Sequence, residues 1–210
     1  MKFFLGTHLA GWLATEAVPL FISDRRLRER KNLPRARVEW CLDSGGFTEV
    51  SQHGRYQTSP AEYAERVQMY ADSIGLLEWA APQDWMCEPF VIEKTGLTIV
   101  EHQRRTVENV LTLRKIAPRL PFIPVIQGWS VDDYRRCVGF YKSAGINLSK
   151  EKTVGVGSVC RRQGTIAGER IFRMLKMDFG LNLHGFGIKT QAFNLYGSLL
   201  KSADSLAWSF

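Results

Sequence analysis

The chain is 210 residues long, is 45% hydrophobic and 23% charged, and carries a formal net charge of +7. These values exclude a disordered chain and allow one domain, residues 1–210, with a sizeable core. No apolar run approaches the roughly 20 residues that a transmembrane helix requires. Residues 6–8, Gly-Thr-His, interrupt the apolar start at residues 3–5 too early for a secretory signal. We therefore expect no membrane partner.

The cysteines are spread along the chain, and no two of them form a Cys-x-x-Cys pair. They are Cys41, Cys87, Cys137 and Cys160. Structural zinc sites and disulfide scaffolds need closer or paired cysteines, so neither is expected here. We expect a reducing compartment, the cytoplasm, and a protein that uses no metal ion or other cofactor.

The chain opens with two short apolar segments, residues 2–7 and 18–23, which predict strands. A basic connection follows over residues 24–37, where we expect a partial helix that ends at its proline. Residues 38–42 predict a third strand. The polar residues 48–58 then predict a long loop.

Much of the positive charge lies in the basic connection, at Arg25, Arg26, Arg28 and their neighbours. A local excess of this kind in a basic domain predicts a polyanionic partner such as a nucleic acid. A solvated charged face is the alternative interpretation of the same run.

From residue 59 onward, helix and strand signals alternate. Capping patterns at Ser59, Thr98 and Ser130 predict helix starts, and further helices are expected around residues 171–177 and 195–200. Five apolar segments predict the remaining strands, at residues 76–82, 122–126, 153–158, 181–187 and 203–208.

This alternation predicts a parallel sheet with right-handed crossovers. Eight strands close naturally into a barrel, so we expect an α/β fold, a compact TIM-type (β/α)8 barrel whose first two units are abbreviated. A doubly wound open sheet is the alternative, although no Gly-x-Gly-x-x-Gly follows the first strand.

Polar residues follow the predicted strands at their carboxyl ends, which meet at one face of a barrel. They are Asp43, Asp84, Gln127, residues 155–158, His184 with Gly185, and Asp204. Two carboxylates suit glycosidic chemistry, since one attacks the anomeric carbon while the other transfers protons. A third carboxylate beside an amide suits recognition of a purine edge, and Phe47 is placed to stack on the base. For Asp43 alone, a loop acid that caps the next turn is the alternative.

Residues 43–47, Asp-Ser-Gly-Gly-Phe, resemble the signature of the tRNA-guanine transglycosylase superfamily. Asp204 follows at about the spacing of the family's nucleophile. The likeness continues in order along the chain at residues 81–84, 125–128, 154–157 and 184–187. Within the superfamily, the segments most similar to the DpdA branch are residues 79–89, 155–163 and 202–205.

The resemblance to the DpdA branch, found in bacteria and their viruses, implies exchange of guanine in double-stranded DNA for a 7-deazaguanine such as preQ0. It implies that Asp204 is the nucleophile, that Asp43 is the acid and base, and that the target nucleotide leaves the stack. It also implies which residues bind the base, namely Phe47, Asp84, Gln127, Gly157, Ser158, His184 and Gly185. Phosphate contacts are expected from Arg161, Arg162 and Lys189, together with Arg25, Arg26 and Arg28.

Two departures from the superfamily pattern bear on the substrate. The tRNA enzymes carry a zinc site after the nucleophile, whereas only six residues follow Asp204 here, and Thr48 stands where the family has Gln. The missing zinc site favours DNA over tRNA. A tRNA-guanine transglycosylase, a base-removing glycosylase and a non-catalytic nucleic-acid-binding barrel are the alternative functions. A core histidine at His184 and a surface charge at Lys189 are the alternative roles.

Overall fold

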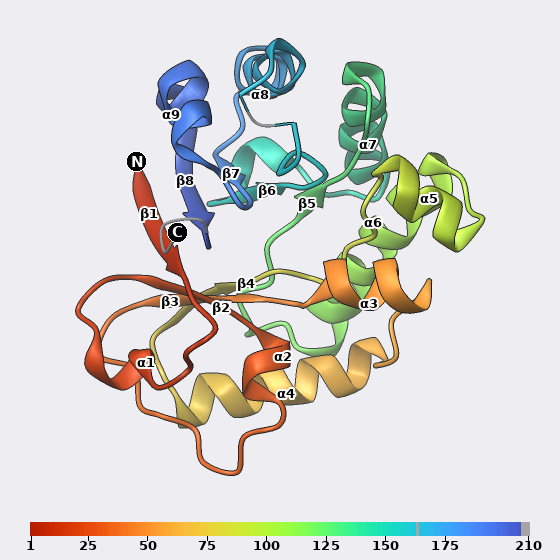
Figure 1. The fold of residues 1–210 in the computed structure, drawn as a ribbon. Coiled ribbons are helices and arrows are strands. Elements are labelled where there is room, and N and C mark those ends of the chain that lie inside the picture. The colour runs from red at the N-terminus through yellow and green to blue at the C-terminus, as the bar shows by residue number, and fades with distance from the viewer. Residues whose placement is uncertain (163, 207–210) are drawn as a thin grey trace.

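The structure is a computed structural model that describes residues 1–162 and 164–206. Its strands form one sheet with the order β4-β3-β2-β1-β8-β7-β6-β5, in which every pair is parallel (Figure 1). The strands are β1 (Lys2–Gly6), β2 (Leu20–Ser23), β3 (Trp40–Asp43), β4 (Leu77–Ala80), β5 (Val125–Ile126), β6 (Val154–Val156), β7 (Leu183–Gly185) and β8 (Leu200–Ser205). The predicted α/β class and parallel sheet are confirmed.

The sheet curls like a TIM barrel but does not close, which corrects the expected closed (β/α)8 barrel. Its edge strands β4 and β5 form no ladder, and one isolated bridge joins Ala80 to Phe122. Ala80 N–H donates to the Pro121 carbonyl at 3.0 Å, and Ile123 N–H donates to the Ala80 carbonyl at 3.1 Å. Pro121 has no N–H group to donate to β4, and Pro82, which follows β4, has none to donate to the segment that enters β5, so the pairing does not extend.

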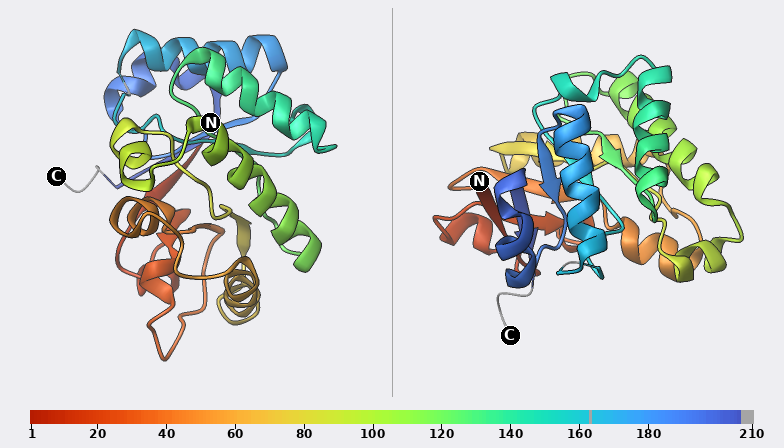
Figure 2. Two further views of the ribbon diagram at one scale, coloured as in Figure 1. Left: turned by 90° about the vertical axis from the view of Figure 1, so that its right-hand side faces the viewer. Right: turned by 90° about the horizontal axis from the view of Figure 1, so that it is seen from above.

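Helices surround the sheet, as the views in Figure 2 show. They are α1 (Trp12–Thr15), α2 (Asp24–Leu27), α3 (Gly46–His53), α4 (Pro60–Ser73), α5 (Pro89–Thr95), α6 (Ile99–Ile116), α7 (Val131–Ser143), α8 (Ile166–Phe179) and α9 (Thr190–Tyr196), with single 3-10 turns at Leu148–Lys150 and Gly197–Leu199. None of these helices, in the part of the chain that the structure describes, combines the length and apolar character needed to cross a bilayer.

The predicted helix caps are found at the expected residues. The Ser59 and Ser130 hydroxyls accept the backbone N–H groups of Glu62 and Asp133, whose carboxylates accept the cap N–H groups in return. Thr98 accepts the N–H of Glu101 at 3.2 Å. Each such cap contributes about 1 kcal/mol to helix stability. The caps therefore fix where α4, α6 and α7 begin.

The first two units are abbreviated, as expected, because α1 and α2 have four residues each. Several boundaries were wrong. The helix in residues 24–37 ends at Leu27, well before its proline, and α3 occupies part of the predicted loop. The chain around Leu199 and Leu200 is a 3-10 turn that leads into β8. Residues 207–208 of the last predicted strand lie outside the described residues.

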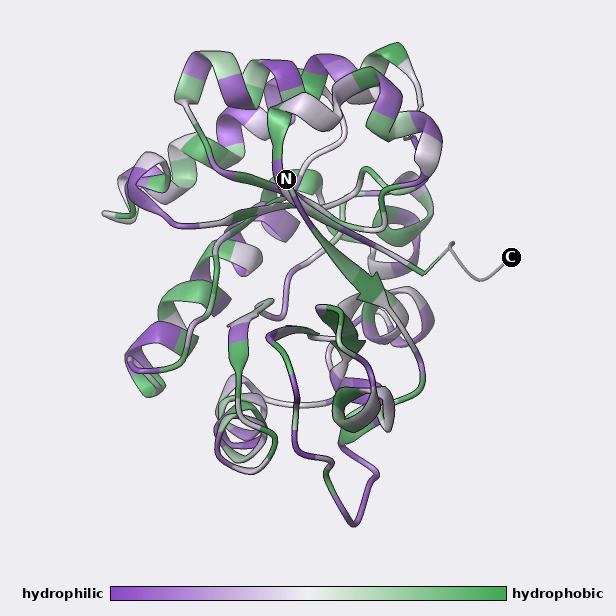
Figure 3. Cartoon of the chain, turned by 90° about the vertical axis from the view of Figure 1, so that its left-hand side faces the viewer, coloured by the Kyte–Doolittle hydropathy of each residue, from purple (hydrophilic) through white to green (hydrophobic). Residues whose placement is uncertain are grey.

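Among the described residues, the hydrophobic core comprises two outer clusters, one inner cluster and a small fourth cluster between α3, α5 and the segment after β4. One outer cluster lies between β5–β8 and the helices α6–α9, and the other lies between β2–β4 and α4. Figure 3 shows the apolar residues gathered on the strands and inner helix faces, and polar residues on the loop after α2. The inner cluster fills the curl of the sheet with Phe4, Phe21, Cys41, Trp79, Ala81 and Ile123. This inner cluster forms the floor beneath the polar residues at the carboxyl ends of the strands.

Candidate active site

A cavity of about 200 Å³ lies at the carboxyl ends of the strands. Six predicted site residues line it, namely Asp43, Phe47, Asp84, Gln127, Gly157 and Ser158; the other lining residues are Phe21, Ala81, Met86, Glu88, Val159, Cys160, Phe186 and Gly187. A volume below the roughly 300–1,000 Å³ of typical small-molecule pockets suits a single heterocyclic base. A larger cavity of about 520 Å³ lies at the amino-terminal side, beside Arg114 and Lys201, and holds none of the predicted site residues.

The glycines after β3 turn the chain sharply into α3. Gly45 has a φ of +76°, which glycine adopts without a steric penalty. A Cβ atom at Gly46 would lie 2.0 Å from the Tyr56 hydroxyl oxygen. That hydroxyl donates to the backbone carbonyl of Asp84 at 2.7 Å. The Asp-Ser-Gly-Gly pattern therefore lets α3 pack closely against the segment after β4.

Asp43, the last residue of β3, is partly buried in the cavity wall. The pKa of its carboxyl is raised to about 6, mainly by burial and also by the nearby Asp204, against the lowering effect of hydrogen bonds with the Ser23 side chain and the Gly45 backbone. A carboxyl with this pKa is able to hold or release a proton near neutral pH.

Asp204 is placed by β8, which pairs with β1 and β7. Its side chain is 6% exposed. One carboxylate oxygen, Oδ1, accepts the Gly187 backbone N–H at 3.1 Å and lies 3.1 Å from His184 Nε2. Asp204 is not itself part of the cavity lining, but its partner Gly187 is.

His184 lies beneath the cavity rather than in its lining. Its side chain is fully buried, and its Nδ1 lies 2.9 Å from Ser202 Oγ. The ring centroid is 4.7 Å from that of Trp79 and 4.8 Å from that of Phe186. The structure thus places the predicted stacking residue against Asp204, while Phe186 faces the cavity. The buried Gly185 makes room for Ile188, whose Cγ1 would lie 2.6 Å from an added Cβ.

A hydrogen-bonded chain of four side chains forms the opposite wall. Gln127 Nε2 donates to Asp84 Oδ2, and Gln127 Oε1 lies 2.7 Å from Ser158 Oγ. Ser158 Oγ also lies 2.8 Å from Glu88 Oε2. Burial, together with the nearby Asp43, raises the pKa of Asp84 to about 7 against the lowering effect of the Gln127 hydrogen bond, and burial also raises the pKa of Glu88.

The end of β6 is shaped to admit this chain. A Cβ atom at Gly157 would lie 2.2 Å from Gln127 Nε2, so glycine is required for the amide to lie across the strand end. Ser158 has a φ of +56°, a rare conformation for a residue with a side chain. Tyr134 anchors this turn by donating from its hydroxyl to the Gly157 carbonyl at 2.7 Å. The strained turn aims the Ser158 hydroxyl at Glu88.

The irregular segment 81–88 is held in place by one face of α6. His102 Nδ1 lies 2.6 Å from the Met86 carbonyl, and Thr106 accepts the Trp85 N–H at 2.8 Å. These side chains are four residues apart and so share a helix face. These side chains thereby take the place of the missing ladder between β4 and β5, and they fix the backbone that carries Asp84 and Glu88.

Sequence reasoning missed Glu88 and Phe186 as cavity residues. Glu88 precedes Pro89 at the start of α5, a position that normally faces water, yet it is 2% exposed. No local signal predicts that burial, because it depends on Ser158 from a distant strand. Phe186 carried a weak signal, since it follows a strand end within the matched segment 184–187.

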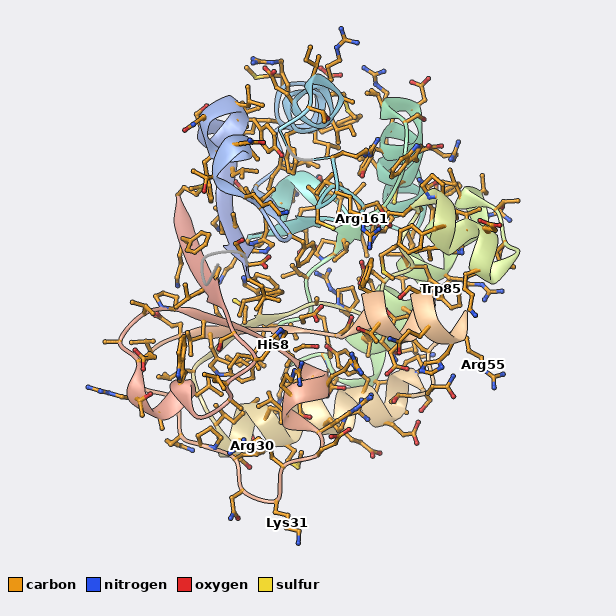
Figure 4. All side chains as sticks on the ribbon, in the orientation of Figure 1. His8, Arg30, Lys31, Arg55, Trp85 and Arg161 are labelled. Atoms are coloured by element: carbon orange, nitrogen blue, oxygen red, sulfur yellow. The ribbon has the colours of Figure 1, made fainter. Side chains whose placement is uncertain are left out.

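An aromatic and cationic cluster borders the cavity mouth. Phe47 is 40% exposed, and its ring centroid lies 6.0 Å from that of Phe90. The guanidinium of Arg161, which is labelled in Figure 4, lies 4.6 Å from the Phe90 centroid and 5.5 Å from that of Phe47. Cation–π contacts of this kind hold the guanidinium over the mouth.

The other predicted phosphate contacts fall into two groups. Arg25, Arg26 and Lys189 are exposed, and Arg25 packs over Gly45 at the rim. Two arginines have partners within the protein. Arg28 pairs with the buried Glu49 at 3.0 Å, and Arg162 stacks on the Trp129 ring at 4.0 Å while donating to the Trp129 carbonyl at 2.6 Å.

Within residues 1–162 and 164–206, no three His, Cys, Asp or Glu side chains are grouped so as to hold a metal ion. Cys41, Cys87 and Cys137 are buried and Cys160 is partly buried.

Comparison with known proteins adds a family to this geometry. The model of one family, described as DpdA, DeoxyPurine in DNA protein A, matches residues 1–210, the whole chain. No curated protein matches the chain. The family is related to transglycosylases and has a role in 7-deazaguanine modification of DNA. With its full length matched, the chain belongs to the DpdA family.

Proposed function

We propose that the protein exchanges guanine in double-stranded DNA for a 7-deazaguanine base through a covalent intermediate on Asp204. The observation that carries this proposal is the convergence of two carboxylates, Asp43 and Asp204, beside a cavity of base size whose opposite wall is Asp84, Gln127 and Ser158. Family membership supplies the DNA substrate and the class of base.

In the first half of the proposed reaction, Asp204 attacks C1′ of the target deoxyguanosine. The bond between C1′ and N9 breaks, and protonated Asp43 gives its proton to the leaving guanine. The hydrogen bonds from Gly187 N–H and His184 occupy Oδ1, which leaves Oδ2 of Asp204 for the attack. His184 acts here by orienting the carboxylate.

In the second half, the incoming 7-deazaguanine, preQ0 or a related base, gives its N9 proton to Asp43. Its nitrogen then attacks C1′, and the Asp204 carboxylate leaves. The ester between Asp204 and the sugar retains the energy of the glycosidic bond, so the exchange requires no metal ion, cofactor or nucleotide hydrolysis. A pKa of about 6 lets Asp43 serve as acid and then as base.

Recognition of the base is assigned to the opposite wall and the mouth. Asp84 accepts hydrogen bonds from the purine N–H groups, and Gln127, Gly157 and Ser158 make the remaining contacts with the same edge of the purine. Phe21, Phe47 and Phe186 are aromatic side chains of the cavity lining. Since the cavity has room for a base alone, the target nucleotide must leave the duplex stack. Basic residues at the rim then contact its phosphates.

The test is transfer of labelled guanine or preQ0 into duplex DNA and tRNA, side by side, with the wild-type protein and Asp204→Ala. We expect label in DNA only, and none with the variant. Label in tRNA would assign the protein to the tRNA reaction. Abasic sites formed in the absence of an added base would indicate a glycosylase, and DNA binding without label in either substrate would indicate a non-catalytic subunit.

A further inference from the structure

The Ser158 hydroxyl has more acceptors around it than it has protons. Its oxygen accepts the Cys87 backbone N–H at 2.7 Å. It also lies 2.7 Å from Gln127 Oε1 and 2.8 Å from Glu88 Oε2, and both of these are acceptor oxygens when Glu88 is ionised. One hydroxyl proton cannot serve two acceptors. Some other group in this wall must therefore carry a proton.

With a single proton between the two carboxyl groups, two arrangements satisfy every link from Asp84 to Glu88. In the first, protonated Glu88 donates to Ser158, Ser158 donates to Gln127 Oε1, and Gln127 Nε2 donates to ionised Asp84. In the second, the amide is turned over, so that protonated Asp84 donates to Gln127 Oε1, Gln127 Nε2 donates to Ser158, and Ser158 donates to ionised Glu88. The structure has Gln127 Nε2 toward Asp84, which is the first arrangement.

We propose that Asp84, Gln127, Ser158 and Glu88 share one proton, and that Glu88 is a positioning residue which, by taking that proton, leaves Asp84 ionised for the base. The inference deepens the proposed function, since it rests on Asp84 reading the purine edge. Glu88 acts through Ser158 and Gln127 and does not itself need to touch the base. No atom is lost in the change between arrangements, because the proton leaving one carboxyl is matched by one taken up at the other through solvent.

The surroundings of both carboxyl groups favour a retained proton. Glu88 is 2% exposed and Asp84 is partly buried, and burial raises the pKa of each. The groups that face them act in opposite directions. Those near Glu88 are Arg161, Arg162, Asp84, Cys87, Cys160 and Tyr134, and those near Asp84 are Asp43, Glu88, Tyr56 and Gln127. The two arginines lower the pKa of Glu88 and Asp43 raises that of Asp84, while burial, the largest effect at both sites, raises the two values together.

Replacing Glu88 with glutamine tests this directly. The amide of Glu88→Gln donates to Ser158 at every pH, so the wall no longer needs a shared proton and Asp84 is free to ionise. We expect the pKa of Asp84 to fall by about 1 or more. The measurement is a carboxyl carbon-13 NMR titration of the base-free protein, with Asp84→Asn to assign the signal. Glu93→Gln on α5 removes the same charge from an exposed site and should leave Asp84 unchanged.

A double-mutant cycle separates the hydrogen-bonded chain from a charge effect through space. Ser158→Ala removes the link while keeping both carboxyls, and Ser158→Gly does the same with a residue suited to the φ of +56°. In either background, Glu88→Gln should no longer change the Asp84 titration by more than about 0.3. An unchanged Asp84 titration in Glu88→Gln alone, or an equal shift with and without Ser158, would overturn the proposal.

The same variants separate this inference from the proposed reaction. The titration uses no DNA and no activity, so the shared proton is testable even if base exchange fails. In guanine binding, wild-type affinity should vary with pH between about 5 and 8, whereas Glu88→Gln should bind with a flatter profile. Loss of binding at every pH with an unchanged Asp84 titration would assign Glu88 a purely structural role.

Discussion

The two walls of the cavity hold their carboxylates in different ways. On the side of β7 and β8, Asp204 Oδ1 accepts the Gly187 N–H and lies 3.1 Å from His184 Nε2, whose ring is held in turn by Ser202. On the side of β4 to β6, Asp84 and Glu88 are joined through an amide and a hydroxyl with one proton too few. The first wall fixes the position of a charge, whereas the second lets a charge respond to its surroundings. In the proposed reaction, these properties suit attack at C1′ and recognition of a base.

The largest expected effect comes from removing the fixed charge. Asp204→Asn keeps the size of the side chain but removes the nucleophile, so we expect base exchange to fall by about 10³-fold or more. The measurement is incorporation of labelled guanine into duplex DNA. Asp132→Asn on α7, whose side chain is 87% exposed, is the matched control and should retain activity. If Asp204→Asn retained more than a tenth of wild-type activity, Asp204 would not be the nucleophile.

Asp43→Asn should separate activity from stability. Loss of the acid and base is expected to slow exchange by about 10²–10⁴-fold. Because the folded pKa of about 6 lies above the unfolded value of 3.8, the folded state binds more protons between these pH values, and the free energy of unfolding falls as pH rises through them.

The Asn variant lacks this loss, so its stability relative to wild type should rise by about 1–3 kcal/mol between pH 4 and pH 8. Urea denaturation at both pH values measures the difference. A relative stability that does not change with pH would show that Asp43 is not strained by burial.

A smaller effect is expected from disturbing the opposite wall. The Cβ of Gly157→Ala would lie 2.2 Å from Gln127 Nε2 and must displace the amide, so guanine affinity should fall by about 10-fold. Calorimetry with free guanine measures it. Gly139→Ala on α7 is the control, since an added Cβ there meets nothing within 4 Å. Equal affinities for the two variants would mean that Gln127 does not contact the base.

The smallest effect is expected at the rim. Arg161→Ala should weaken DNA binding a few-fold and reduce the slope of log affinity against log salt by about 1 if the guanidinium contacts a phosphate. Lys31→Ala on the loop after α2, which lies away from Arg161 in Figure 4, should change neither quantity. If Lys31→Ala weakened DNA binding more than Arg161→Ala did, the DNA would instead bind along that loop.

Much of the fold was predictable because its signals are local. Cap residues such as Ser59 and Ser130 fix helix starts within a few residues of sequence, and alternation of strands and helices defines a parallel sheet. The gap between β4 and β5 was not predictable from spacing, because it reflects one bridge and the prolines beside it.

The candidate site divides in the same way. Asp43 ends β3 and Gln127 directly follows β5, so topology brings these two residues to one cavity. Asp84 lies beyond the end of β4, on the segment that His102 and Thr106 hold in place. The contact of Glu88 with Ser158 and the burial of His184 against Asp204 depend on residues from different strands. Such contacts leave no periodic signal in the sequence.

The most direct test of the central claim is to trap the covalent intermediate. The protein is incubated with duplex DNA without an added base, denatured and analysed by mass spectrometry of proteolytic peptides. We expect an adduct of the DNA lacking one guanine, attached at Asp204, absent in Asp204→Asn and detectable in Asp43→Asn. An adduct on Asp43, or release of guanine with no adduct on any peptide, would contradict the account.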